Sequence, residues 1–162
     1  MSAIKLKFKN INSVNSKAPQ MAVHVNSKEL FKGQVSEEHV IDVDLQEQNT
    51  LKIYFINKED PDTVIQDGKI INDLNFELEN ITVDQHDIQD LIWKGKYVSK
   101  DSVIPSCLFF GPRGYFELHF EYPILKWILK TNHQDHNDDP TWEQDYNYYI
   151  EACQLLHKIQ KK

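Results

Sequence analysis

The feature that most constrains this chain is the regular alternation of apolar and polar residues in several short segments of its first 121 positions. Residues 4–9 read IKLKFK, and residues 115–121 read YFELHFE. In an extended strand such alternation places successive side chains on opposite faces, so that one face is buried and the other is solvated. The strand segments follow one another without intervening helical patterns, which favours antiparallel sheets over a parallel α/β fold.

The stretch from Tyr54 to Asp84 forms the centre of this pattern. It begins in one alternating strand, crosses an acidic loop at residues 57–73, and ends in a second alternating strand. Asp60-Pro61-Asp62 and Asp67-Gly68 are turn formers within the loop. The alternation shifts by one residue at Glu79-Asn80, which predicts a β-bulge because an unbroken strand would turn the following side chains to the wrong face.

A tight turn is predicted in the segment that contains two of the five glycines. The strands Cys107–Phe110 and Tyr115–Glu121 flank Gly111-Pro112-Arg113-Gly114, which predicts a hairpin with a four-residue loop. Alternation in the second strand predicts that Phe116 and Leu118 point inward.

Beyond residue 121 the hydrophobic period changes from two to about 3.6 residues, which indicates helix. Pro123 suits the first turn of a helix, because its fixed φ and its missing N–H are harmless there. Thr141 and Gln144 fit a capping box at the start of a second helix. An apolar stripe at helical spacing then consists of Trp142, Tyr146, Tyr149, Ile150, Cys153 and Leu156.

These patterns predict the architecture. We expect a mainly β chain, namely an antiparallel jelly-roll-like β-sandwich over residues 1–121, with one or two C-terminal α-helices. The helical extension covers residues 122–162 and would pack on the sandwich or on a partner. At 162 residues the chain is long enough to bury a sizeable core.

Charge and composition exclude several classes of function. The net charge of −7 repels phosphate backbones, so we expect no nucleic-acid partner. We expect no membrane partner, because no segment approaches the ~20 apolar residues of a membrane span. The N-terminal sequence MSAIKLKFKN lacks the continuous apolar segment of a signal peptide, which predicts folding in a cytoplasm. Cys107 and Cys153 are interpreted as buried free thiols rather than as a disulfide.

Four aspartates in and after the acidic loop are candidate metal ligands. Calcium takes six to eight oxygen ligands from carboxylates, amides and carbonyls, and loops at the end of a sandwich can supply them. The spacing is not that of an EF-hand, and the alternative is a solvated loop whose aspartates make turns. The candidates are Asp60, Asp62, Asp73 and Asp84.

Other chemistry has weaker signals. His133 and His136, with Asp135, Asp138 and Asp139 around them, could bind zinc, although a polar loop between two helices is the simpler interpretation. There is no G-x-S-x-G elbow and no local Cys–His signature. We therefore expect no enzyme activity and no cofactor, with Ca²⁺ left open.

Four aromatic residues are candidates for a surface that binds a glycan or a protein partner. An aromatic ring at a surface can stack on a sugar or anchor a protein interface. The alternative is that most of them belong to the core or to the rim of the helix–sheet contact. The candidates are Tyr54, Trp93, Tyr97 and Tyr115.

Residues from about Ile4 to Asp84 resemble the small calcium-dependent, xylan-binding type of carbohydrate-binding module. The motifs of that family correspond here to Phe55-Ile-Asn57-Lys58, Asp73-Leu-Asn75-Phe76 and Val83-Asp84-Gln85, preceded by PQMAVHVNSKELF. The resemblance implies a jelly-roll sandwich with Asp73 and Asp84 as metal candidates. Lys58 stands where the family has an acidic calcium ligand, and its ammonium would replace the cation if it points into that site.

A second resemblance covers most of the chain. The pattern K-x-x-x-D-T-x-x-x-D-G-x-I-x-x-D, from Lys58 to Asp73, and the later aromatic segment FELHFEYPILKWIL are similar to uncharacterised proteins of large tailed bacteriophages. It implies a non-enzymatic structural or assembly protein of the virion, in a head, neck or tail, assembled in the host cytoplasm. Its partners would be other virion proteins or copies of itself. The alternative function is a calcium-dependent glycan-binding module.

Overall fold

The computed structural model describes residues 1–135, 144, 147–148, 150–152 and 154–155. The predicted second helix lies largely outside these residues: Thr141 of its capping box is not described, nor are Trp142, Tyr146, Tyr149, Cys153 and Leu156 of its stripe. The zinc candidates also fall there. His136, Asp138 and Asp139 are not described, and the side chains of His133 and Asp135 are not described either.

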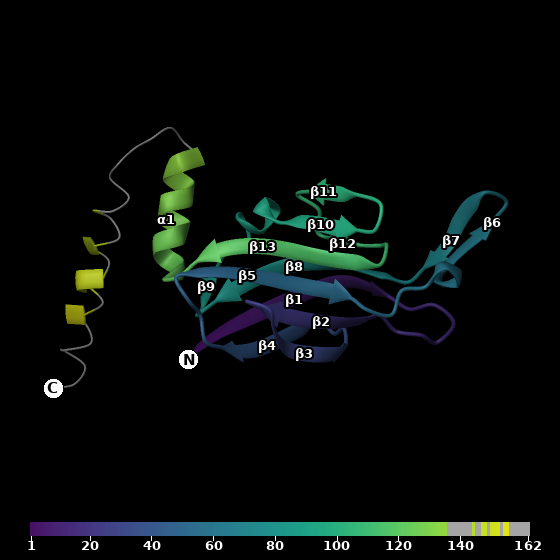
Figure 1. Ribbon diagram of the computed structural model, residues 1–162, viewed down its shortest axis with the longest axis horizontal. Coiled ribbons are helices and arrows are strands. Elements are labelled where there is room, and N and C mark those ends of the chain that lie inside the picture. Colours follow the sequence, from purple (N-terminus) through teal and green to yellow (C-terminus); the bar gives the residue numbers. More distant parts are fainter. Residues whose placement is uncertain (136–143, 145–146, 149, 153, 156–162) are drawn as a thin grey trace.

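Two antiparallel sheets face each other as the layers of a sandwich (Figure 1), which confirms the predicted fold class. The first sheet has the order β12–β8–β1–β4, with β9 also paired to β8. Its strands are β1 (Ser2–Asn12), β4 (Glu38–Val43), β8 (Asn75–Val83), β9 (His86–Asp87) and β12 (Phe109–Phe110).

The second sheet has the order β11–β10–β13–β5–β2–β3. Its strands are β2 (Gln20–Val25), β3 (Lys28–Gln34), β5 (Gln48–Phe55), β10 (Lys96–Ser99), β11 (Val103–Pro105) and β13 (Gly114–Glu121). The central pair β5–β13 runs in unbroken register from Gln48 opposite Glu121 to Phe55 opposite Gly114.

The inward side chains of both sheets form one hydrophobic core, as the alternation predicts. Its centre is aromatic: Phe76 of β8 stacks on Phe110 of β12 with ring centroids 4.4 Å apart, and Phe8 meets Phe76 edge-on at 5.5 Å. The predicted bulge is confirmed, because the register between β1 and β8 shifts at Glu79. This extra residue keeps both Leu78 and Ile81 buried.

The predicted hairpin at residues 107–121 is wrong. β12 pairs with β8 in the first sheet, whereas β13 pairs with β5 and β10 in the second. The segment 111–113 therefore crosses from one layer of the sandwich to the other. The crossing follows from burial, because Phe110 packs against Phe76 while Phe116 fills the core from the opposite sheet.

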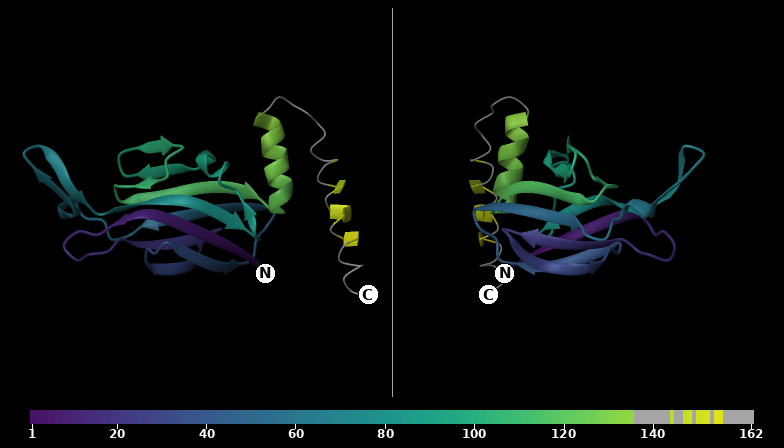
Figure 2. Two further views of the ribbon diagram at one scale, coloured as in Figure 1. Left: turned by 180° about the vertical axis from the view of Figure 1, so that it is seen from behind. Right: turned by 45° about the vertical axis from the view of Figure 1, so that its right-hand side comes forward.

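The predicted acidic loop contains more regular structure than expected. A 3₁₀ turn, η1 (Asp60–Asp62), leads into a hairpin of β6 (Thr63–Gln66) and β7 (Lys69–Asp73). Asp67 and Gly68 form its turn with φ of 54° and 75°, the conformation that a two-residue hairpin turn of Asp-Gly favours. The hairpin projects from one end of the sandwich (Figures 1 and 2).

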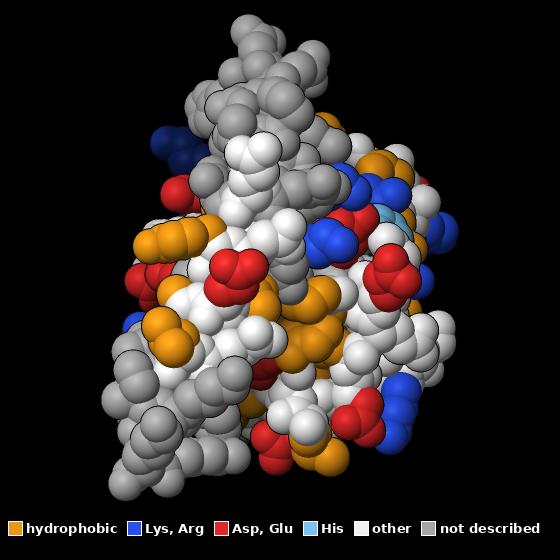
Figure 3. Space-filling model, turned by 90° about the vertical axis from the view of Figure 1, so that its left-hand side faces the viewer, with side chains coloured by type: hydrophobic (Ala, Val, Ile, Leu, Met, Phe, Trp, Pro, Cys, Tyr) orange, Lys and Arg blue, Asp and Glu red, His pale blue; other side chains and the backbone are white. Residues whose placement is uncertain are grey.

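One helix, α1 (Ile124–Asp135), begins directly after Pro123, as predicted. Ile124 and Trp127 are buried, and the ring centroids of Trp127 and Phe120 of β13 are 6.3 Å apart, so this helix packs on its own sandwich. It stands at the end opposite the β6–β7 hairpin (Figure 1). Seen from the end that carries α1, hydrophobic side chains reach the surface between charged ones (Figure 3).

A short 3₁₀ turn, η2 (Ile92–Lys94), precedes β10. Among the described residues, no helix has the length and apolar character needed to cross a membrane. Cys107 is a free, half-buried thiol.

Phe110→Ala is expected to lower the free energy of unfolding by about 3–5 kcal/mol, because it removes a fully buried ring from the aromatic centre of the core. Phe109→Ala is the matched control: its ring is 42% exposed, and its loss should cost at most about 1 kcal/mol. Urea unfolding of both variants measures the difference. Equal losses would contradict the placement of β12.

Candidate functional site

Two tyrosines form a cross-strand pair on the outer face of the second sheet. Tyr54 of β5 lies directly opposite Tyr115 of β13, and their ring centroids are 5.1 Å apart. Because their neighbours Ile53 and Phe116 point into the core, alternation turns both tyrosines outward, where they are half-buried. His24 of β2 lies on the other side of Tyr54, with ring centroids 4.9 Å apart. We call His24, Tyr54 and Tyr115 the aromatic strip.

Polar groups surround the aromatic strip. The ammonium of Lys52 lies 5.1 Å from the centre of the Tyr115 ring, in the geometry of a cation–π contact. On the same face of β13, Glu117 Oε1 lies 2.7 Å from His119 Nε2, and His119 Nδ1 lies 2.9 Å from the hydroxyl of Thr50. The surface therefore combines apolar ring faces with hydrogen-bonding groups beside them.

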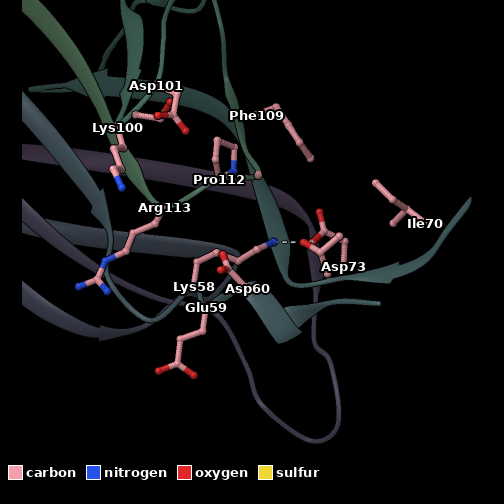
Figure 4. A pocket seen from close by; sticks show the side chains of 13 residues that line it. Lys58, Glu59, Asp60, Ile70, Asp73, Lys100, Asp101, Phe109, Pro112 and Arg113 are labelled. Atoms are coloured by element: carbon pink, nitrogen blue, oxygen red, sulfur yellow. Dashed lines mark hydrogen bonds and ion pairs between the residues drawn. The ribbon is translucent and has the colours of Figure 1, made fainter. Parts of the chain in front are cut away.

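A cavity of about 520 Å³ lies at the end of the sandwich, between the base of the β6–β7 hairpin and the crossing segment 111–113 (Figure 4). Ile70 and Phe109 contribute apolar surface, while Lys100, Asp101 and Arg113 contribute charges. We call this space the end cavity.

A second cavity, of about 560 Å³, lies on the outer face of the sheet. It is lined by Tyr54 and His24 of the aromatic strip. Arg113 lines both cavities, so the strip and the end cavity adjoin at this residue. Together they offer an elongated surface rather than a single closed pocket.

A buried ion pair forms one wall of the end cavity. The ammonium of Lys58, which is 7% exposed, donates to Asp73 Oδ1 and to the backbone oxygen of Leu74 at 2.6 Å. The hydroxyl of Thr63 donates to the same Oδ1 at 2.7 Å, and the amide of Asn75 donates to Oδ2 at 3.2 Å. The Asp73 carboxylate thus has partners on both oxygens.

These contacts determine the charge state of the carboxylates. Burial alone would raise the pKa of Asp73, but the hydrogen bonds from Lys58, Thr63 and Asn75 outweigh it and hold the pKa below its usual value. Burial likewise opposes ionisation of Asp62, but the hydrogen bond from Lys17 at 2.6 Å and another from the backbone N–H of Glu59 hold its pKa below the usual value. Both groups are therefore carboxylates at neutral pH.

The four predicted metal ligands do not come together. Asp60, Asp62 and Asp73 lie around the base of the hairpin, whereas Asp84 follows the far end of β8. There Asp84 accepts hydrogen bonds from the backbone N–H of Ala3 and from the hydroxyl of Tyr122, each at 2.9 Å. Among the described residues, no three acidic, histidine or cysteine side chains are grouped to hold a metal ion.

The donor set at Asp73 does not fit a calcium ion. A calcium site needs oxygens that are free to face the ion. Here an ammonium group contacts both the carboxylate and the neighbouring carbonyl. Lys58 thus points into the site, in the way that the sequence resemblance left open.

The aromatic predictions divide into three outcomes. Tyr54 and Tyr115 lie together on the outer face. Trp93 is 52% exposed but stands apart in η2. The expectation that Tyr97 lies at a surface is wrong: its ring is fully buried, and its hydroxyl donates to the backbone oxygen of Pro112 at 2.5 Å. Burial strongly raises the pKa of Tyr97, so it stays a neutral phenol.

Sequence reasoning missed three residues of the site: His24, Lys52 and Arg113. Alternation along β2 and β5 is compatible with outward positions for His24 and Lys52, but only the register of β2, β5 and β13 brings them beside the tyrosines. Arg113 had been assigned to a hairpin turn. No local signal identifies it as the residue that the two cavities share.

Asp73→Asn is expected to lower the free energy of unfolding at neutral pH by about 3–5 kcal/mol, because it leaves the buried ammonium of Lys58 unpaired. The folded-state pKa of Asp73 lies below the unfolded value of about 3.9. Its stabilisation is therefore complete above that value and is lost as the pH falls through the folded-state pKa. The variant and the wild type should accordingly converge in strong acid.

Urea unfolding as a function of pH checks this expectation. Asp60→Asn is the matched control, because Asp60 is exposed and its substitution should change stability by about 0.5 kcal/mol or less. A loss for Asp73→Asn no larger than for Asp60→Asn would contradict the buried ion pair.

Comparisons with known proteins give matches of structure only. No protein-family model and no curated protein sequence matches this chain. Among solved structures the chain is similar to vCBM60 in complex with galactobiose, with 10% sequence identity and a TM-score of 0.45 over 71% of this chain and 95% of that one. It is also similar to the SeMet form of vCBM60. That structure is described as showing that circular permutation provides an evolutionary link between two families of calcium-dependent carbohydrate binding modules. That match has 9% identity and a TM-score of 0.43 over 72% of this chain and 89% of that one. Both matched structures are carbohydrate-binding modules, and the likeness is one of fold.

Proposed function

We propose that this chain is a non-enzymatic recognition module that binds a glycan along the aromatic strip and the adjoining end cavity. The observation that carries the proposal is the pair of half-buried tyrosines, Tyr54 and Tyr115, on an open sheet face with their rings 5.1 Å apart. An aromatic ring offers a flat apolar surface to the C–H face of a sugar, and the tyrosine hydroxyl adds a polar contact.

The surroundings of the strip support a polar ligand with flat apolar faces. Binding sites for small ligands combine apolar and aromatic surface with a few placed polar groups that determine orientation. Lys52, His119 and Glu117 supply such groups on the same face, and Arg113 leads from the strip into the end cavity. The elongated shape suits several linked sugar rings better than one.

The scaffold also supports this proposal. β5 and β13 lie in the interior of the six-stranded sheet, each paired on both sides. Their backbones are therefore held by hydrogen bonds on both edges, and the tyrosines are presented in nearly fixed positions. A site whose side chains are preorganised loses less conformational entropy when ligand binds. The calcium-dependent form of this function is less well supported, because Lys58 already contacts Asp73.

Tyr54→Ala and Tyr115→Ala should each weaken glycan binding about ten-fold or more, because each removes an aromatic contact worth on the order of 1.5 kcal/mol. A glycan array that includes xylo-oligosaccharides and galactobiose would identify ligands, and titration calorimetry would measure the affinities. Trp93→Ala is the control, since it removes an exposed aromatic ring outside the strip.

Two results would count against the glycan proposal. One is an array without hits for the wild-type chain. The other is equal loss of binding for the Trp93 variant and the two tyrosine variants, which would place the ligand elsewhere.

A second candidate function is that of a structural protein in the virion of a tailed phage, as a head, neck or tail component. The sequence resemblance over Lys58 to Asp73 motivates it. One structural observation favours a protein–protein contact, as such a role would need: Ile65, Ile70 and Ile71 are exposed on the projecting hairpin. Exposed apolar side chains of this kind commonly mark protein–protein contacts. The partners would be copies of this chain or other virion proteins.

If the hairpin mediates assembly, formation of oligomers should depend on these isoleucines. If copies of the chain associate through the hairpin, sedimentation should reveal oligomers at high protein concentration. Replacement of Ile65, Ile70 and Ile71 by threonine, which keeps the β-branched shape, should then abolish them. A wild-type chain that sediments as a monomer at all concentrations would remove self-assembly and leave only other virion proteins as partners.

A further inference from the structure

Arg113 is the single arginine among the 18 basic residues of the chain, and it lines both cavities. It is exposed, and no carboxylate of the described residues pairs with its guanidinium. Figure 4 shows its side chain extending away from the ion pair of Lys58 and Asp73. A guanidinium suits a planar anion, because two of its N–H groups can donate to the two oxygens of one carboxylate. Arg113 therefore offers an anion-binding group where the two cavities meet.

The tyrosine pair belongs to a row of cross-strand partners that ends in a second cation. Lys32 of β3 lies opposite Ala22 of β2, and Ala22 lies opposite Tyr54. Tyr54 in turn lies opposite Tyr115, so all four side chains share the outer face of the sheet. Because Ala22 carries only a methyl group, the space between Tyr54 and Lys32 stays open, and these three residues line the second cavity. A ligand stacked on Tyr54 there has a free ammonium on one side.

The acidic residues of this face lie beyond the tyrosines as seen from Arg113. Glu29 is the cross-strand partner of His24, and Glu117 is the partner of Lys52. Lys52 and Arg113 each precede a tyrosine by two residues, but on antiparallel strands, so they lie on opposite sides of the tyrosine pair. The carboxylates of Glu29 and Glu117 are thus set apart from Arg113 by the tyrosine row.

The two cavities differ in charge. The end cavity is lined by more acidic than basic side chains, which disfavours an anion there. The second cavity is lined by Lys32 and Arg113 against Glu29 alone. The residues that line it next to Arg113 are uncharged, namely Gln20, Ile56 and Asn57. Although the chain has a net charge of −7, the second cavity therefore favours a negatively charged group.

We propose that the glycan bound along the aromatic strip is acidic: it carries a carboxylate, as a uronic acid does, and Arg113 and Lys32 bind this group in the second cavity. The inference rests on the proposed function, because it names the class of sugar that the strip holds. Tyr54 takes the apolar face of the sugar ring, while Arg113 donates to the carboxylate oxygens. Hydrogen bonds between charged groups are about twice as strong as neutral ones, so the carboxylate selects among sugars of similar shape.

Comparison of an acidic oligosaccharide with its own methyl ester tests the proposal, because the ester keeps the rings and linkages but removes the charge. The probes are oligogalacturonates and glucuronic-acid-bearing xylo-oligosaccharides on an array with their esters and with sulfated glycans, followed by titration calorimetry. The wild type is expected to bind the acid about ten-fold more tightly than the ester. Arg113→Gln should lose this preference. Arg113→Lys keeps the charge without the planar fork and should retain part of it.

Lys7→Gln is the matched control. It removes the same single charge from an exposed position of β1, in the other sheet, and should keep the full preference for the acid. Urea unfolding of the variants checks that each is folded, as expected for substitutions at exposed positions.

The possible results separate this proposal from the one on which it rests. Equal affinity of the wild type for acid and ester, with both weakened by Tyr54→Ala, would overturn the acidic ligand and leave glycan binding standing. A preference that survives in Arg113→Gln, or that Lys7→Gln also loses, would overturn the role of Arg113. Tighter binding of sulfated glycans than of uronates would overturn the carboxylate. An array without any hit would overturn both proposals.

Discussion

The sandwich depends on the stacking of Phe76 on Phe110 at its centre. These rings belong to neighbouring strands of the first sheet, and Phe110 also meets Tyr97 of the second sheet edge-on at 5.2 Å. Since β12 has only two residues, its backbone pairing contributes little, and burial of the Phe110 ring is what holds this segment against β8. The chain can leave β12 and enter β13 across the sandwich because this contact anchors the crossing.

The candidate binding surface is a consequence of the same core. Each inward residue of β5 and β13 requires an outward neighbour, and the unbroken register between the strands makes those neighbours meet in pairs. Packing of Ile53 and Phe116 in the core therefore brings Tyr54 beside Tyr115 on the opposite face. The end cavity arises in a comparable way, because the crossing segment and the projecting hairpin are both attached to strands that the core holds in position.

Much of the fold could be predicted from the sequence, because period-two alternation reports which side of a strand is buried. The bulge at Glu79 was visible as a phase shift for the same reason. The pairing of β12 was not predictable, since Gly111 to Gly114 suits a turn whether the chain returns to the same sheet or crosses to the other. The hairpin within the acidic loop did leave a signal, an Asp67-Gly68 pair between two short segments that contain β-branched residues, 63–65 and 70–71.

The site was predictable only in part. Tyr54 and Tyr115 are outward by alternation, but their contact depends on register, which no local pattern records. Tyr97 lies in a segment with weak alternation, so its inward orientation depends on the neighbouring strands β11 and β13. The acidic residues near Asp73 suggested a metal, and the buried position of Lys58 could be known only from the structure.

The two outer strands of the six-stranded sheet bear on how this protein behaves in concentrated solution. Any strand at the margin of a sheet exposes backbone groups that can pair with another molecule. Here β3 carries Lys28, Glu29 and Lys32 along its length, and β11 is three residues long and ends in Pro105, which lacks an N–H. Charge, shortness and proline each discourage the addition of a foreign strand. The sheet that displays the aromatic strip is thereby protected against growth into aggregates.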